Sequence, residues 1–341
     1  MRRSAYIRTT ALILFAASVT ATGWGQTKLT GQSAMKFLSI GVGARAAGLG
    51  YSFVTTTDDI ASLFWNPAGI ATLSGTRAFV DVNQWISDIR QFSFAASQNL
   101  GDFGVVGLGF TIMDYGDIPG TAIELSAVNS GSFEYVETGP VKVSNYVLGL
   151  AYAKAISQEF AVGGQIKYVY SGLGSNTIIQ TGGQETIDNT VSTLAFDFGT
   201  TYNTGFRDLT FSMSLRNFSR EIRYPRMTQG FYLPLIFTLG FSIDAVALID
   251  PGATVHSLVL SFNGQHPTDY LEKVSIGAEY SFDHRYFLRA GYNINYSIEN
   301  ITFGLGARVP FSDAEILQFD YAYSVMKYFD GVHRISLGIV L

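Results

Sequence analysis

From about residue 75 onward, apolar and polar residues alternate along the chain with a period of two. In Ile301–Val309 the odd positions are apolar, and the even positions hold Thr, Gly and Arg. The segments Val274–Phe282, Tyr286–Tyr296 and Leu209–Arg216 repeat the pattern. Successive side chains of a β-strand point to opposite faces, so each segment predicts a strand with one apolar and one polar face.

About fourteen such segments can be counted, an even number as in bacterial transmembrane barrels. The expected strands are 76–85, 91–100, 103–114, 142–156, 159–171, 190–203, 208–219, 233–245, 254–264, 271–283, 285–297, 299–310, 314–326 and 331–341. Tight turns follow even-numbered strands, whereas the two longest connections, Tyr115–Val141 and Gly172–Asn189, follow odd-numbered ones. Short periplasmic turns and long outer loops are typical of transmembrane barrels. We therefore predict an all-β fold, a closed antiparallel transmembrane β-barrel that contacts outer-membrane lipid.

The composition separates this fold from a soluble β-sandwich or lipocalin-like barrel, which also alternates. A soluble barrel would expose its polar face, and that face should be rich in Lys and Glu. Here only 14% of residues are charged, against roughly 25% in soluble domains. Aromatic residues make up 14% of the chain. The polar face is mainly Ser, Thr, Gly, Asn and Gln, which favours the membrane barrel.

The N-terminus has the features of a secretory signal peptide. Arg2, Arg3 and Arg8 form a basic region, and the apolar run Ala11–Ala21 follows it. That run is shorter than the roughly 18 residues that a spanning helix needs, and small residues before Gln26 are typical of a cleavage site. The predicted division is 1–25 signal peptide, 26–74 N-terminal plug segment and 75–341 transmembrane β-barrel.

The segment before the strands, Gly31–Ser74, lacks sustained alternation and is rich in Gly and Ala. We expect it to lie inside the barrel as a plug; a periplasmic domain is the alternative. Asp58 is expected to cap a short helix over Ile60–Trp65 that ends at Asn66-Pro67. Arg45 is expected to pair with an acidic residue of the lumen, and the candidates are Asp81, Asp197, Glu279 and Asp320.

Charge and motif content argue against several other functions. The net charge of −5 and the few cationic residues argue against a nucleic-acid partner. The chain has no cysteine, and its four histidines show no ligand spacing, so no metal is predicted. The stretch Gly41–Ala46 resembles a dinucleotide fingerprint but lacks the βαβ unit that the fingerprint requires. We predict no cofactor and no enzymatic activity.

The polar face also carries charges of both signs. These are Asp81, Lys167, Asp197, Arg216, Glu279, Arg289, Arg308, Asp320 and Arg334. Interspersed signs favour a structural network across a filled lumen, because a strongly selective pore tends to carry one sign.

Two stretches of the plug resemble a known family. They are Phe37–Gly50, with Gly43, Ala44, Arg45, Ala46, Gly48 and Gly50, and Asp58–Ile70, with Trp65, Asn66, Pro67, Ala68 and Gly69. With the strand pattern, they make the chain similar to the PorV/PorQ family, a branch of the FadL-like outer-membrane barrels. Leu49 stands where that family usually has Met, and Leu341 stands where barrels commonly end in an aromatic residue. The resemblance implies a 14-stranded barrel with an N-terminal plug and a role in type IX secretion.

Two functions follow as hypotheses. The first is a non-enzymatic, PorV/PorQ-like secretion component that binds a secretion translocon or the signal domain of secreted cargo. The two long loops would pack over the barrel mouth or form the partner surface, with Phe133 and Tyr135 as aromatic anchors. The alternative is a FadL-like transporter of hydrophobic small molecules across the outer membrane.

Overall fold

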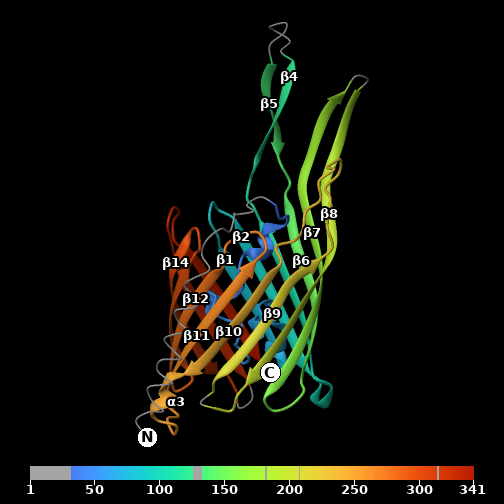
Figure 1. Ribbon diagram of the computed structural model, residues 1–341. Coiled ribbons are helices and arrows are strands. Elements are labelled where there is room, and N and C mark those ends of the chain that lie inside the picture. Colours follow the sequence, from blue (N-terminus) through green and yellow to red (C-terminus); the bar gives the residue numbers. More distant parts are fainter. Residues whose placement is uncertain (1–31, 126–132, 181–182, 207, 313–314) are drawn as a thin grey trace, which may run out of the picture.

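The computed structural model describes residues 32–125, 133–180, 183–206, 208–312 and 315–341 (Figure 1). The predicted signal peptide lies outside these residues. Fourteen antiparallel strands close into a barrel, and two further strands, β4 (Pro119–Leu125) and β5 (Phe133–Pro140), form a separate hairpin. The barrel strands are β1 (Thr76–Gln84), β2 (Arg90–Asn99), β3 (Val105–Asp114), β6 (Ser144–Ala155), β7 (Phe160–Gln180), β8 (Gly183–Asn203), β9 (Thr210–Ser219), β10 (Ile236–Asp244), β11 (His256–Pro267), β12 (Lys273–Phe282), β13 (Tyr286–Ile294), β14 (Glu299–Pro310), β15 (Ile316–Met326) and β16 (Val332–Val340).

These fourteen strands coincide with the fourteen predicted from alternation, and their ends differ by no more than three residues except at β7 and β8. Each barrel strand pairs with the next one along the chain. The exception is β3, which pairs with β6 because β4 and β5 form a separate hairpin between them. β1 pairs with β16 from Arg77↔Val340 to Gln84↔His333 and closes the sheet. The predicted fold class is confirmed.

The two faces of the wall have opposite polarity. On β1, Val80 and Val82 point outward and are 45% and 39% exposed, whereas Asp81 and Asn83 point inward and are buried. A soluble protein would have the reverse arrangement, so the exposed apolar band fits a lipid environment. No helix in the described part of the chain is long and apolar enough to cross a membrane.

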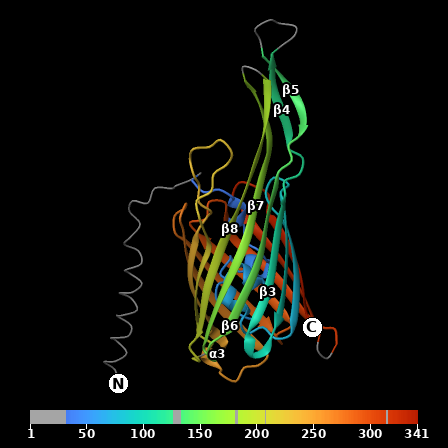
Figure 2. The ribbon, with the colours of Figure 1, turned by 90° about the vertical axis from the view of Figure 1, so that its right-hand side faces the viewer.

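The two long loops expected from the sequence are instead β-hairpins, so that prediction was wrong. β7 and β8 stay paired beyond the barrel as far as Gln180↔Gly183, and β4 pairs with β5. Pairing satisfies the backbone donors and acceptors that an irregular loop of that length would leave to water. Both hairpins project from one end of the barrel, the hairpin end, and rise away from its mouth (Figure 1 and Figure 2). The opposite end, where Leu341 lies, is the turn end.

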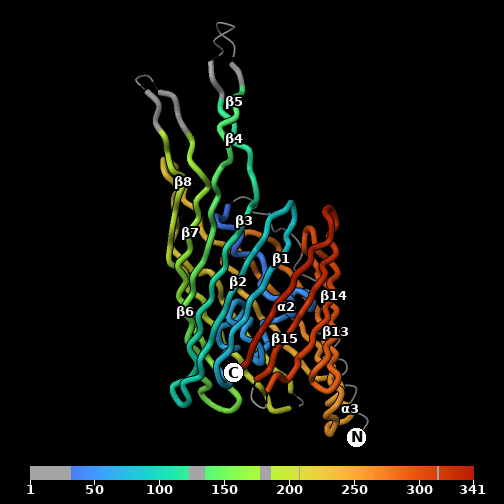
Figure 3. Tube along the Cα trace, turned by 180° about the vertical axis from the view of Figure 1, so that it is seen from behind, coloured from blue at the N-terminus to red at the C-terminus, as the bar shows by residue number. Residues whose placement is uncertain are grey.

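Residues 33–74 run through the lumen as a plug (Figure 2 and Figure 3). Four short helices form it: η1 (Lys36–Ser39), α2 (Ala44–Gly48), η2 (Ile60–Phe64) and η3 (Pro67–Ile70). The plug begins at the hairpin end, where the amide of Ala34 donates to the carbonyl of Tyr232 at 3.0 Å. It ends at the turn end, where Thr76 and Leu341 exchange backbone hydrogen bonds of 3.1 and 2.8 Å. Residues 33–74 therefore cross the lumen lengthwise.

Two short helices lie at the turn end: η4 (Gly101–Phe103) and α3 (Ala245–Ile249). The side chain of Asp244 caps α3 by accepting from the amide of Val246 at 2.8 Å. The sequence pattern did not predict α3. A helical pattern is recognised over windows of about 11 residues or more, and α3 has only five.

Candidate functional site

The first half of the family motif fixes the plug to the wall through Arg45. Its Nε and Nη2 donate to the two carboxylate oxygens of Glu279 on β12 at 2.8 and 2.7 Å, and Nη1 reaches Asp58 at 2.8 Å. Arg289 on β13 joins Glu279 to Asp320 at 2.5 and 2.7 Å. The predicted pairing of Arg45 with a lumen acid is confirmed. Of the mixed lumen charges, Glu279, Arg289, Arg308 and Asp320 join this network, whereas Lys167 and Asp197 form a separate pair.

The helix cap predicted at Asp58 is one residue out. Asp59 caps η2, because its side chain accepts from the amide of Ala61 at 2.9 Å. Asp58 instead bridges Arg45 and Arg308, each at 2.8 Å. Adjacent acidic residues give the same local capping signal, so only the position of the partner cations decides between them.

Glycines of the motif and of the wall allow the plug to lie directly on the sheet. A Cβ atom at Gly48 would lie 2.9 Å from the Cα of Gly304 on β14. Gly50 has φ +62°, and its amide lies where a side chain at Gly291 would begin. Gly in a strand often marks such a close backbone approach.

The second half of the motif is held by Asn66, which is fully buried. Its Nδ2 donates to the carbonyl of Val54 and to Thr201 at 3.0 and 3.1 Å, and its Oδ1 accepts from the amide of Ala68 at 3.1 Å. Pro67 and Ala68 pack on Gly163 of β7. Gly69 is required because a Cβ there would lie 2.6 Å from the carbonyl of Thr56.

The first half of the motif also contains the start of α2. Gly43, with φ +96°, precedes α2, and the amide of Ala44 donates to Ser336 at 2.7 Å. Ala46 is buried in the same helix.

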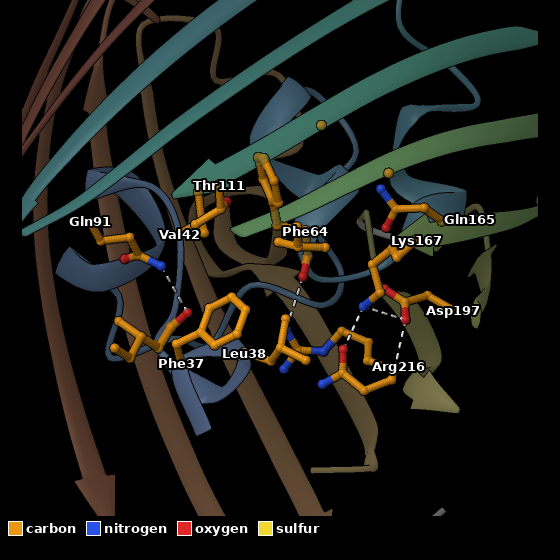
Figure 4. A pocket seen from close by; sticks show the side chains of 15 residues that line it. Phe37, Leu38, Val42, Phe64, Gln91, Thr111, Gln165, Lys167, Asp197 and Arg216 are labelled. Atoms are coloured by element: carbon orange, nitrogen blue, oxygen red, sulfur yellow. Dashed lines mark hydrogen bonds and ion pairs between the residues drawn. The ribbon is translucent and has the colours of Figure 1, made fainter. Parts of the chain in front are cut away.

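A small cavity lies between the plug and the wall strands β3, β6 and β7 (Figure 4). Its apolar side is formed by Phe37, Leu38, Val42 and Phe64. On its polar side, Lys167 pairs with Asp197 at 2.7 Å. The volume is about 50 Å³. A cavity that binds benzene measures roughly 150 Å³, so this one is too small for an aromatic ring.

A larger cleft of about 290 Å³ opens at the hairpin end of the lumen. We call it the aromatic cleft, because Tyr51, Trp65, Trp85, Tyr270 and Tyr296 line it. Tyr51 stacks between Trp65 and Tyr296, with ring centroids 5.7 and 6.4 Å away. The hydroxyl of Tyr51 donates to Glu299 at 2.8 Å. Binding sites for small molecules are typically apolar and aromatic, with a few polar groups, and this cleft has that character.

Cationic side chains complete the cleft. Lys273 lies 4.7 Å above the ring of Tyr296 and 5.1 Å from that of Tyr270, and Arg216 lies 4.9 Å above Trp65. Burial raises the pKa of Tyr296 to about 12, so this phenol is neutral at physiological pH. Lys36 pairs with Asp269 at 2.5 Å, and Ser33 donates to the same carboxylate.

The wall is interrupted beside this cleft. Pairing between β9 and β10 ends at Arg216↔Ile236, and the next residue, Asn217, has φ +64°. The β8–β9 register shifts between Phe196 and Phe198 at the same level. A void of about 350 Å³, the wall void, opens there between β9 and residues 232–235. The aromatic cleft shares Ile40 and Arg216 with the small cavity, which in turn shares Asn217 with the wall void.

The two expected partner anchors lie on the projecting β4–β5 hairpin. Tyr135 is 80% exposed. The backbone of Phe133 pairs with Leu125, and its side chain lies outside the described residues. Within the described part of the chain, no hydrogen bond or ring contact holds Tyr135 to the barrel mouth, so its aromatic ring remains available on the surface.

Comparison with known proteins identifies the fold. The chain matches no protein-family model, and a search of the curated proteins finds no match. It is similar to a Pseudomonas aeruginosa FadL homologue at 11% identity, with a TM-score of 0.55 over 88% of this chain and 98% of that chain. It is also similar to the Pseudomonas putida toluene transporter TodX (12% identity, TM-score 0.53, 83% and 94% covered) and to the CymD monoaromatic hydrocarbon channel (11%, 0.52, 88% and 96%).

At such identities the likeness shows a shared fold, that of FadL-type outer-membrane channels. None of these structures is named as a PorV/PorQ protein, so that resemblance stays a prediction. Sequence reasoning missed the aromatic cleft, because Tyr51, Lys273 and Tyr296 come from three distant segments. The only local sign was the high aromatic content.

Proposed function

We propose that this protein carries small hydrophobic molecules, aromatic ones among them, across the outer membrane. The observation that carries the proposal is the aromatic cleft, which opens at the hairpin end and is walled by stacked rings of the plug and the barrel. Similarity to barrels named as a toluene transporter and a monoaromatic hydrocarbon channel supports it. The proposal replaces protein secretion as the leading function.

The route that we propose leaves the lumen sideways. Toward the turn end, the plug is bound to the wall by Arg45, Glu279, Asp58 and Arg308, so a straight passage would break several ion pairs, of which Arg45–Glu279 is buried. Toward the wall void, the cleft shares Ile40 and Arg216 with the small cavity, which reaches the void at Asn217, and it shares Asp269 with the void itself. A shift of η1 would connect the three spaces.

Uptake of a labelled monoaromatic compound by cells with a tight outer membrane tests the proposal. Cells that produce the protein should take up the compound faster than cells without it. Ser297→Trp places a large ring at the rim of the cleft and should reduce uptake several-fold. Ser144→Trp, an exposed position at the same end outside the cleft, is the matched control and should not. Uptake equal to that of cells lacking the protein would refute the proposal.

A secretion component is the second candidate, because two hairpins project beyond the barrel and carry an exposed aromatic side chain at Tyr135. Long connections of this kind are usually functional. The family resemblance of the plug motif is the other support. The hairpin truncation described below separates the two candidates.

A further inference from the structure

The aromatic cleft contains more positive charge than its own acids neutralise. Three cationic side chains line it, Lys36, Arg216 and Lys273, against two carboxylates, Asp269 and Glu299. Lys36 forms an ion pair with Asp269 at 2.5 Å, and Glu299 accepts a hydrogen bond from Tyr51. The cleft thus carries one positive charge more than its carboxylates neutralise. Neither Lys273 nor Arg216 forms an ion pair of 4 Å or less with a carboxylate of the described residues.

Arg216 is the more unusual of the two, because it is 9% exposed and its Nε has no hydrogen-bond partner. Its Nη1 donates to the carbonyl of Phe64 at 2.9 Å, which fixes the guanidinium between the cleft and the small cavity. The carboxylate that acts on its charge, Asp197, pairs with Lys167 at 2.7 Å and forms no ion pair of 4 Å or less with Arg216, so Nε keeps no acceptor. A buried donor without an acceptor is costly. A bound anionic group would supply the missing acceptor.

Lys273 is held differently, by the faces of Tyr270 and Tyr296. Cation–π contacts orient an ammonium group but leave its donors free for another acceptor. The same rings, with Tyr51 and Trp65, offer a flat apolar wall. The cleft therefore offers two cations without a direct ion pair beside stacked aromatic faces. Its volume of about 290 Å³ exceeds the roughly 150 Å³ of a cavity that binds benzene.

We propose that the aromatic cleft selects single-ring aromatic carboxylates, with the ring against Tyr51, Trp65 and Tyr296 and the carboxylate toward Lys273 and Arg216. The inference rests on the proposed transport function and gives its substrate class. It differs from uptake of neutral hydrocarbons, for which unpaired cations would be a disadvantage. It also differs from binding of alkyl carboxylates, which would leave the aromatic faces without a stacking partner.

Binding to the full-length protein in detergent tests the proposal, because Trp65 and Trp85 line the cleft and their fluorescence reports occupancy. Benzoate should bind roughly tenfold more tightly than benzyl alcohol, its neutral counterpart, and than hexanoate. Lys273→Met should remove most of the preference for benzoate, because it should lower the affinity for benzoate far more than that for benzyl alcohol. Lys327→Met is the matched control, because Lys327 also lies over a tyrosine ring, Tyr328 at 5.1 Å, outside the cleft. It should change neither affinity.

Equal affinities for benzoate and benzyl alcohol would overturn the inference and leave transport of neutral aromatics standing. Hexanoate binding as tight as benzoate would overturn the aromatic part of the selectivity. A Lys273→Met protein that loses both ligands equally would overturn the role of the ammonium group. An absence of binding by all three compounds, together with failed uptake, would refute the transport function itself. Folding of Lys273→Met is checked by its unfolding temperature, so a loss of structure is recognised separately.

Discussion

Arg45 and Glu279 form a two-pronged ion pair between the plug and strand β12, with Nε–Oε2 and Nη2–Oε1 distances of 2.8 and 2.7 Å. Both side chains are buried, 9% and 7% exposed. Parallel hydrogen bonds of this kind are stronger and more directional than a single contact between charged groups. The plug position near the turn end therefore depends on one arginine that lies far from its partner in the sequence.

Removal of the carboxylate should loosen the plug. We expect Glu279→Gln to lower the free energy of unfolding by roughly 3–5 kcal/mol, because Arg45 and Arg289 would keep buried charges without their shared partner. Urea unfolding followed by tryptophan fluorescence measures the change. Asp283→Asn removes the exposed partner of Arg285 and should cost less than about 1 kcal/mol. Equal losses of unfolding free energy in the two variants would show that the buried ion pair contributes no more to stability than the exposed one.

A side chain on the wall beneath α2 should displace the plug. At Gly304 a Cβ atom would lie 3.1 Å from the Cα of Gly48, so Gly304→Val should destabilise the protein by roughly 1–3 kcal/mol. At Gly264 the nearest atom would be 3.9 Å away, and Gly264→Val should be nearly neutral. Single-channel conductance in planar bilayers provides a second readout, since a displaced plug should raise the conductance. Unchanged conductance and stability for Gly304→Val would contradict the close packing.

Acid should release the start of the plug. Burial raises the pKa of Asp269, but hydrogen bonds from Lys36 and Ser33 and the charge of Lys36 outweigh it, so the pKa lies below its usual value. The contact is thus fully stabilising above the unfolded pKa of roughly 3.9 and is lost as the pH falls through the lower folded pKa. A spin label at Gln32→Cys, in a chain without native cysteine, should become mobile only below about pH 4. Asp269→Asn should make the label mobile at neutral pH; a rigid label there would argue against the contact.

Truncation of the two hairpins distinguishes transport from secretion. Replacement of residues 117–141 by a tight turn, and of residues 173–189 by another, leaves every barrel strand paired over its membrane-spanning part. The barrel should therefore still assemble and keep its resistance to unfolding in detergent. Uptake of small aromatics should persist, because no cleft residue is removed. If the hairpins instead receive a secreted partner, export of that partner should stop, and unchanged export would exclude them as its binding surface.

The strands of the barrel wall could be predicted from the sequence, because the pattern that marks a strand is local. Alternation with period two needs only the residues of one strand, and it located all fourteen strands. The same rule failed at β7 and β8, since the segment Gly172–Asn189 was predicted as a loop. In the structure, the β7–β8 register shifts between Gly172 and Ser175, and pairing then resumes.

The site was less predictable because its parts meet only after the barrel closes. Arg45 was singled out as a residue that needs an acid, yet four acids fitted that description and only the fold chose Glu279. Lys273 and Tyr296 gave no local signal of a binding site, because Lys273 begins β12 and Tyr296 lies just beyond β13, in segments that look like their neighbours. Charge complementarity across the lumen is a property of the closed sheet, and a single strand does not reveal it.

The lengthwise course of residues 33–74 also constrains how the protein is made. The plug starts at the hairpin end and emerges at the turn end, directly beside the Thr76–Leu341 contact that seals β1 against β16. A chain already surrounded by fourteen paired strands would have to be threaded past buried ion pairs to reach this position. We therefore expect the plug to nucleate the structure, with the last strand docking around it, so that the final step of biogenesis locks the plug inside the finished wall.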